Sequence, residues 1–219
     1  MQLESLNIKG QSLWISPERS IYWEAEQALI VSDLHFGKTG HFRKSGIAVP
    51  QSVYKEDLQR LISHIRYFNA GKVIIVGDLF HSHENKELDL FLKWRNDFGE
   101  VQLLLVKGNH DILRSSWYEK AGITVHKPTL NIGGFCFQHD PGDCAEEDGT
   151  AADYLFSGHI HPGVSISGMG KQTLRFPCFY FSNDYCILPA FSKFTGSVAM
   201  EKGKGEIIYA IVNNTLIRI

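Results

Sequence analysis

The sequence of 219 residues lacks the marks of several large protein classes. No stretch approaches the roughly 20 apolar residues of a transmembrane helix, and the first residues, MQLESLNIKGQSLWIS, hold no apolar segment after a basic start. We therefore expect no membrane partner, no export signal and a cytoplasmic location. No repeat, linker or low-complexity segment divides the sequence, so we expect one domain over residues 1–219.

Cysteine and net basic charge are also scarce. The four cysteines form no C-x-x-C pair, which argues against a structural zinc knuckle and fits a reducing compartment. The formal net charge is −2, so bulk basicity gives no indication of nucleic-acid binding and leaves room only for a local basic patch. With 43% hydrophobic and 21% charged residues, the composition is that of an ordinary folded domain.

Hydrophobic patterns predict two kinds of structure along the chain. Strands at 12–15, 20–23 and 28–31 precede alternating helices and buried strands: helices at 50–68 and 88–98, strands at 72–76 and 101–106. Strands that alternate with helices imply parallel pairing. After about Ile123 only short strands follow, at 130–132, 135–138, 154–156, 163–166, 173–181, 187–188 and 207–211. We predict an α/β fold in which two sheets pack face to face with helices outside.

Ten histidines are an unusual number, and several lie beside Asp, Asn and Gly at the ends of apolar runs. Five short segments share one layout, in which a strand runs into a polar turn: DLH at 33–35, GD at 77–78, GNHD at 108–111, HD at 139–140 and GHIH at 158–161. The carboxyl ends of parallel strands open on one edge of a sheet, so residues there converge in space. Convergence is what a metal site requires.

Counting the possible ligands predicts the number of metal ions. There are seven candidates: Asp33, His35, Asp78, Asn109, His139, His159 and His161. Seven side chains exceed what one ion with open positions takes, whereas two cations roughly 3.5–4 Å apart clamp both oxygens of an in-line displacement at phosphorus. Imidazole, carboxylate and amide ligands favour Mn, Fe, Zn or Ni over Mg or Ca. The sequence thus predicts two divalent cations and hydrolysis of a phosphate ester.

Each segment taken singly also has a purely structural interpretation. A lone D-x-H or G-D at the end of a strand is common. In the third segment, Gly108 can supply a positive φ while Asn109 caps a helix. What favours function is the occurrence of all five segments in this order.

The ordered set D-x-H, G-D, G-N-H-D, H and G-H-x-H resembles the calcineurin-like metallophosphoesterase superfamily over residues 32–161. The resemblance implies a double β-sandwich flanked by helices. It implies one metal ion on Asp33, His35, Asp78 and His161. It implies a second ion on Asp78, Asn109, His139 and His159, so that Asp78 is shared.

The resemblance also assigns the two residues that follow Asn109. His110 is expected not to bind metal but to stabilise charge on the phosphate or protonate the leaving oxygen, and Asp111 is expected to orient it. The fourth segment departs from the superfamily pattern, because the usual G-H context is here QHDP at 138–141. His139 is therefore the ligand that the resemblance supports least.

Further stretches are similar to one bacterial subfamily, the DNA ligase-associated metallophosphoesterases. They are SDLHFGK at 32–38, HFRKSG at 41–46, GDLFHS at 77–82, GHIHP at 158–162 and LPAF at 188–191. This resemblance implies manganese-dependent DNA endonuclease and phosphodiesterase activity. It also implies DNA as a substrate and an association with a ligase and a helicase in DNA repair.

Several side chains near these segments are candidates for substrate binding. Lys38 and Arg43 follow the first segment and would reach phosphates beside the scissile one, although a solvated basic loop is the alternative. His81 is a candidate for substrate contact or for support of a ligand. Phe36 would stack on a base or serve in the core, and Arg175 is a weaker candidate for phosphate contact.

Three functions remain open at this point. The first is a DNA-processing phosphodiesterase, and the second is a phosphatase or phosphodiesterase acting on small nucleotides or other small phosphate esters. The third is a non-enzymatic scaffold of the same fold, against which stands the presence of every expected ligand.

Overall fold

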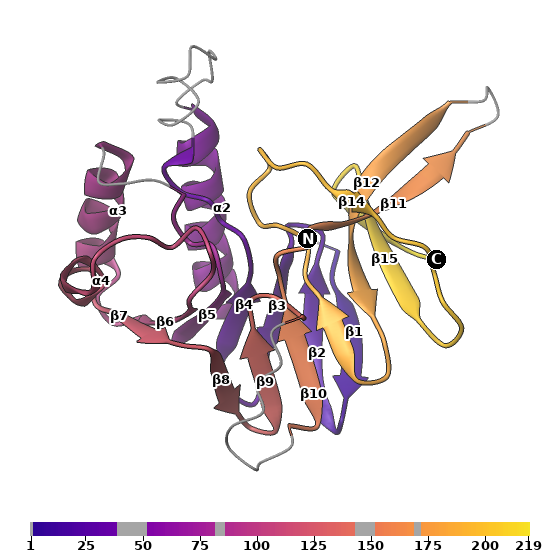
Figure 1. The fold of residues 1–219 in the computed structure, drawn as a ribbon, viewed down its shortest axis with the longest axis horizontal. Coiled ribbons are helices and arrows are strands. Elements are labelled where there is room, and N and C mark those ends of the chain that lie inside the picture. The colour runs from indigo at the N-terminus through magenta and orange to yellow at the C-terminus, as the bar shows by residue number, and fades with distance from the viewer. Residues whose placement is uncertain (1, 39–51, 82–85, 143–151, 169–171) are drawn as a thin grey trace.

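The computed structural model describes residues 2–38, 52–81, 86–142, 152–168 and 172–219, which form two facing β-sheets (Figure 1). The first sheet has strands in chain order: β1 (Glu4–Ile8), β2 (Gln11–Ser16), β3 (Ser20–Trp23), β4 (Ala28–Val31), β5 (Lys72–Val76), β6 (Gln102–Val106) and β7 (Ile123–His126). The strands from β1 to β4 pair antiparallel, and those from β4 to β7 pair parallel. The parallel pairing predicted for the helix-containing half is thus confirmed.

The second sheet is built from the later part of the chain. Its strands are β8 (Thr129–Ile132), β9 (Phe135–Gln138), β10 (Tyr154–Ser157), β11 (Pro162–Ser167), β12 (Thr173–Phe181), β13 (Tyr185–Ile187), β14 (Val198–Ala199), β15 (Ile207–Val212) and β16 (Thr215–Arg218). Strand β10 pairs parallel with β9 and β13. The long strand β12 pairs with β11 through its first half and with β13 and β15 through its second.

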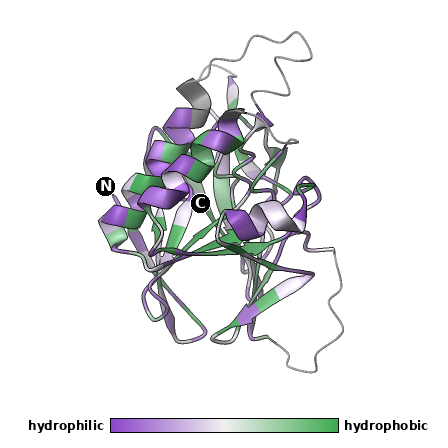
Figure 2. Ribbon diagram, turned by 90° about the vertical axis from the view of Figure 1, so that its left-hand side faces the viewer, coloured by the Kyte–Doolittle hydropathy of each residue, from purple (hydrophilic) through white to green (hydrophobic). Residues whose placement is uncertain are grey.

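Three helices cover the outer face of the first sheet: α2 (Ser52–Phe68), α3 (Lys86–Asp97) and α4 (Ser115–Lys120) (Figures 1 and 2). In the described parts of the chain, no helix covers the outer face of the second sheet. The predicted α/β double sandwich is therefore confirmed, and the helices that the structure describes lie on one side of it. None of the described helices is both long and apolar enough to cross a membrane.

The central strands of the first sheet are apolar throughout because both of their faces are covered. In β4, Leu29 and Val31 pack toward the helices, whereas Ala28 and Ile30 pack toward the second sheet. Between the sheets, the ring of Trp23 lies 4.7 Å from that of Phe135. A fully buried apolar side chain contributes about 1.5–3 kcal/mol, so this shared core holds the two sheets together.

The parallel strands of both sheets end at the same edge of the sandwich. Backbone bonds extend the β4–β5 pairing past the strands, since Asp33 N donates to Gly77 O at 3.2 Å and His35 N donates to Asp78 O at 2.9 Å. The chain after β13 returns to this edge, where Phe191 N donates to Ser32 O at 2.7 Å. The polar turns that follow β4, β5, β6, β9 and β10 are thereby brought together.

Candidate metal centre

The backbone at this edge is unusual at five positions. Eleven described non-glycine residues have a positive φ, and the five that lie at this edge are Asp33, His35, Asp78, His159 and His161, with φ between 47° and 64°. The left-handed region costs an L-residue roughly 1–2 kcal/mol, and such residues cluster at functional sites. All five are predicted metal ligands, so nearly half of these strained positions lie where the sequence places the site.

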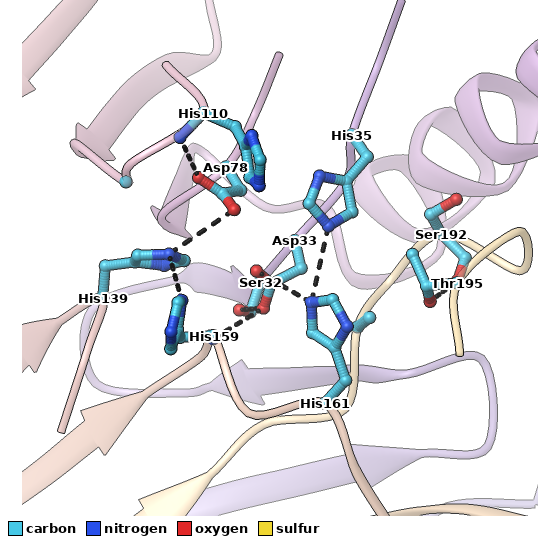
Figure 3. Close-up of polar contacts among 12 residues, drawn as sticks. Ser32, Asp33, His35, Asp78, His110, His139, His159, His161, Ser192 and Thr195 are labelled. Atoms are coloured by element: carbon cyan, nitrogen blue, oxygen red, sulfur yellow. Dashed lines mark hydrogen bonds and ion pairs between the residues drawn. The ribbon is translucent and has the colours of Figure 1, made fainter. Parts of the chain in front are cut away.

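The first group of ligand atoms joins the turn after β4 to the turn after β10 (Figure 3). The Nε2 atoms of His35 and His161 lie 3.4 Å apart, and Asp33 Oδ1 lies 3.2 Å from His161 Nε2. Two imidazole nitrogens and a carboxylate oxygen thus point toward one another across the two sheets.

The second group gathers around the ring of His139 (Figure 3). Its Nε2 lies 3.1 Å from Asn109 Oδ1, 3.2 Å from His159 Nδ1 and 3.5 Å from Asp78 Oδ2. The four residues of this group lie in the turns that follow strands β5, β6, β9 and β10. His139, the ligand least supported by the sequence, lies at the centre of this group.

In each of the two carboxylates, one oxygen accepts hydrogen bonds and the other faces the imidazoles. Asp33 Oδ2 accepts hydrogen bonds from Ser32 Oγ and from His159 N, the latter at 3.1 Å. Asp78 Oδ1 accepts a hydrogen bond from His110 N at 2.9 Å. Asp33 Oδ1 and Asp78 Oδ2 are therefore left to face the imidazoles.

Two glycines allow this close packing. At Gly77, whose φ is +80°, an added Cβ would overlap the ring of His139. At Gly158, it would overlap Ser32 Oγ and lie 2.6 Å from Asp33 Oδ2. The glycines of the G-D and G-H-x-H segments are thus explained by the space that the ligands need.

The two carboxylates dominate the electrostatics of the site. Burial alone would raise the pKa of Asp78, but the hydrogen bond and charge of His139, with the amide of His110, lower it to about 2. Burial alone would lower the pKa of His139, but the bond to Asp78 and the charges of Asp33 and Asp78 raise it to about 9. The pocket therefore favours a positive charge beside these carboxylates.

The donor atoms fit divalent cations. Asp33, His35 and His161 have ligand atoms within 4.8 Å of one another, as do Asp33, Asp78 and His139. Buried Asp33 Oδ1 has no hydrogen-bond donor among the described residues, and burial lowers the pKa of His35 to about 3, so its ring is neutral. Neutral imidazole and a carboxylate oxygen without a hydrogen-bond donor are what a borderline divalent ion binds.

The structure brings together all seven side chains that were predicted as ligands. Asp33 belongs to both groups of three ligand atoms that lie within 4.8 Å of one another, and Asp78 belongs to one. The assignment of particular ligands to particular ions stays a prediction.

His110 and His81 lie next to the ligand atoms. Their ring centroids are 4.0 Å apart, and the His110 ring is 5.8 Å from that of His35. The carboxylate oxygens of Asp111 accept hydrogen bonds from the backbone amides of Phe80 and Gly108, both at 3.0 Å. Asp111 therefore holds the turn that carries His110, and its predicted effect on the ring of His110 stays a prediction.

The other substrate-binding candidates have different outcomes. Lys38 is half-buried, and burial lowers its pKa. The charges of Asp78 and Asp33 act in the opposite direction, so the ammonium of Lys38 lies in the electric field of both carboxylates. Arg43 lies outside the described residues. Phe36 is 2% exposed and belongs to the core beneath the helices, which rules out stacking on a base.

A network of hydrogen bonds and an ion pair beneath the site was not predicted from the sequence. Arg60 on α2 pairs with Asp57 at 3.0 Å and donates to Phe191 O. Asp57 Oδ2 accepts a hydrogen bond from Lys193 N at 3.3 Å, and Ser192 N donates to Asp33 O at 3.2 Å. Only the charged pair at 57 and 60 on a buried helix face was available in the sequence as a signal.

A layered pair of sheets whose strand ends gather imidazole, carboxylate and amide ligands defines a metal-dependent hydrolase. Residues 27–135 match the family model of the calcineurin-like phosphoesterases. The match ends before His139, and the last three ligands are placed by the structure.

A solved structure with a high TM-score supports this fold, and a more distant similarity is also found. The crystal structure of the nuclease MPE of Pseudomonas putida is similar with a TM-score of 0.82 and 26% identity, covering 100% of both chains. Yfce, a phosphoesterase from E. coli, is similar with a TM-score of 0.43 and 13% identity over 88% of this chain and 97% of that one. A comparison with curated proteins found no relative of similar sequence.

Proposed function

We propose that this protein is a nuclease: a dinuclear metal-dependent phosphodiesterase that hydrolyses phosphodiester bonds of DNA. The observation that carries the proposal is the meeting of two ligand groups around Asp33, one at His161 and the other at His139. The similarity over the full length to a structure described as a nuclease supports a nucleic-acid substrate.

The residues of the chain have distinct tasks in this proposal. The seven ligands, Asp33, His35, Asp78, Asn109, His139, His159 and His161, hold two divalent cations. When bound, such a pair lowers the pKa of a water molecule and neutralises charge on the phosphate. His110, whose amide holds Asp78 and whose ring lies beside His81, donates the proton that the leaving oxygen needs.

The resemblance of the sequence to the DNA ligase-associated metallophosphoesterases supports a more detailed proposal. We propose Mn as the metal, with Fe, Zn and Ni as alternatives, and a cytoplasmic role in DNA repair together with a ligase and a helicase. Lys38 and Arg43 would contact the phosphates next to the scissile one, and His81 would contact the substrate or support His110.

Cleavage assays with one histidine variant test the proposal. The chelator-treated protein is loaded with Mn and given single-stranded DNA, a cyclic nucleotide and a chromogenic phosphodiester. The wild type should cleave DNA, and His110→Ala should lower kcat by about 10²–10⁴ with unchanged metal content, because loss of a general acid costs this much. His126→Ala, which changes a half-buried histidine on β7, is the control and should retain activity.

The other outcomes separate the competing functions. Cleavage of small esters alone would contradict the DNA part of the proposal and favour an enzyme of small nucleotides. No cleavage of any substrate with two metal ions bound would favour a scaffold.

A further inference from the structure

A pocket lies directly behind the imidazole of His161. Its volume is about 160 Å³, and its walls come from β2–β3, β11–β12 and the segment after β13. The described residues lining it are Arg19, His161, Pro162, Arg175, Pro177, Ala190, Thr195, Gly196 and Ser197. Since His161 Nε2 faces Asp33 and His35, a single ring separates this pocket from the ligand atoms of the metal centre.

The pocket is positively charged. Arg19 and Arg175 are the charged groups among its described lining residues, and no carboxylate is among them. Arg19 is fixed in place because its Nη1 donates to Ala190 O at 3.1 Å and to Ser192 O at 2.7 Å. Arg175 makes one such bond, from Nη1 to Ser197 O at 3.0 Å, and is otherwise exposed. A guanidinium that uses one of its five N–H donors retains the others for a ligand.

The segment that closes the pocket offers further donors. The Oγ1 of Thr195 donates to Ser192 O at 3.0 Å, which turns this segment back on itself beside His161 (Figure 3). The backbone amides of Gly196 and Ser197 have no acceptor among the described residues. Since the one hydroxyl hydrogen of Thr195 is used in this bond, the donors left for a ligand are the guanidinium of Arg175 and the free backbone amides, which are groups that bind phosphate oxygens in proteins.

We infer that this pocket binds a second phosphate group of the substrate, the one next to the scissile phosphate along a nucleic-acid strand. The inference rests on the proposed function and narrows it. A strand whose scissile phosphate lies at the metal centre passes over His161 and places its neighbouring phosphate on Arg175. The pocket thereby distinguishes a polynucleotide, which carries two phosphates in succession, from a small diester, which carries one.

Arg175 is the residue to change, because Arg19 also holds the backbone of the segment after β13. Arg175→Ala should lower kcat/KM on single-stranded DNA about tenfold or more, as expected for loss of a charged hydrogen bond. Hydrolysis of bis-p-nitrophenyl phosphate should change less than about twofold, because that ester has no second phosphate. Arg175→Lys should recover part of the DNA activity.

Binding measured without cleavage gives a second readout. The slope of log affinity for single-stranded DNA against log salt should become shallower by about 0.7 in Arg175→Ala, the value for one lost phosphate contact. Arg218→Ala, which removes an exposed arginine of edge strand β16, is the matched control and should leave cleavage unchanged. An equal loss in Arg218→Ala, no loss in Arg175→Ala, or an equal loss on the small ester would overturn the inference.

Short inhibitors keep this test separate from that of the proposed function. A thymidine dinucleotide with a 5′- or 3′-terminal phosphate should inhibit hydrolysis of the small ester more strongly than the dinucleotide that lacks a terminal phosphate. In Arg175→Ala, the dinucleotides with and without a terminal phosphate should inhibit equally. If the wild type cleaves no DNA but shows this difference, the proposed function fails and the pocket stands. If terminal phosphates make no difference in the wild type, the pocket inference is wrong.

Discussion

At the scale of single residues, the metal centre depends on positions where the ligand and its backbone are both constrained. Asp33 and Asp78 have left-handed backbones, and each has one carboxylate oxygen fixed by an amide so that the other faces the imidazoles. The unfavourable conformation is maintained by these bonds and by glycines that leave room for the ligands. Precise placement therefore comes from groups that do not touch the metal themselves.

Replacing Gly77 tests this dependence. Gly77→Ala should lose at least one metal ion per chain and most activity, because the new methyl group would displace the ring of His139. Gly10→Ala is the control: its φ of +82° imposes the same backbone cost of about 1 kcal/mol, but its Cβ would meet no atom within 4 Å. Metal content and the free energy of unfolding in chelator are the measurements. Equal metal content in both variants would contradict the role given to Gly77.

The sequence predicted which side chains converge better than it predicted their surroundings. Asp33, His35 and His139 follow apolar strands in recognisable segments, so their convergence was foreseeable from parallel pairing. The bond of Asp111 to the amide of Phe80 was not, because it joins two turns that are 31 residues apart in the sequence. The same holds for Arg19, whose contacts lie more than 170 residues away at 190 and 192.

At the scale of elements, the success of prediction follows burial. Strands β4, β5 and β6 are buried on both faces and helix α2 is amphipathic, so their patterns are clear. The edge strands β1 and β16 were missed because β1 only alternates half-buried and exposed residues and β16 has a single buried residue, so their patterns are weak. Strand β7 has a single buried residue, and helix α4, with six residues, is too short for a periodic pattern.

Helix α2 also contains a buried histidine that should make stability depend on pH. His64 contacts Ser20 of β3, with His64 Nδ1 2.8 Å from Ser20 Oγ. Burial lowers its pKa to about 4, the charge of Arg60 acts in the same direction and that of Glu18 opposes it. The unfolded chain takes up a proton near pH 6.5 while the folded chain does not, so stability falls as the pH drops from about 6.5 toward 4.

The size of this effect is measurable with one variant. Between pH 7 and pH 5, His64 should account for a loss of about 2 kcal/mol in the free energy of unfolding, because its pKa is about 4 in the folded chain and 6.5 in the unfolded chain. His64→Gln keeps a polar group for Ser20 but does not titrate. Between pH 7 and pH 5, the free energy of unfolding of this variant in urea should therefore fall by about 2 kcal/mol less than that of the wild type. The same dependence on pH in both proteins would contradict the assignment.

At the scale of the whole molecule, the two sheets depend on each other. Trp23 of the first sheet packs against Phe135 and Phe137 of the second, and the ligand groups also draw on both sheets. The polar centre thus lies at the edge of an apolar layer to which each sheet contributes one side. We propose that residues 1–219 fold as one domain, because neither sheet could keep its inner face from water alone.

Unfolding in urea tests this proposal with a probe in each sheet. All four tryptophans lie before residue 118, whereas Cys178 and Cys186 are buried in the second sheet, where burial raises the pKa of Cys178 to about 12 and suppresses its reaction with alkylating agents. In chelator, tryptophan fluorescence and alkylation of these two cysteines, located by mass spectrometry, should show the same midpoint.

Phe137→Ala should lower the urea midpoint of both probes together, because it should lower the free energy of unfolding by about 3–5 kcal/mol. Added Mn should raise both together, because its ligands come from both sheets and the ion binds only the folded chain. Two separate midpoints would mean that the sheets unfold independently, and a rise confined to tryptophan would mean that His139, His159 and His161 contribute little to holding the metal.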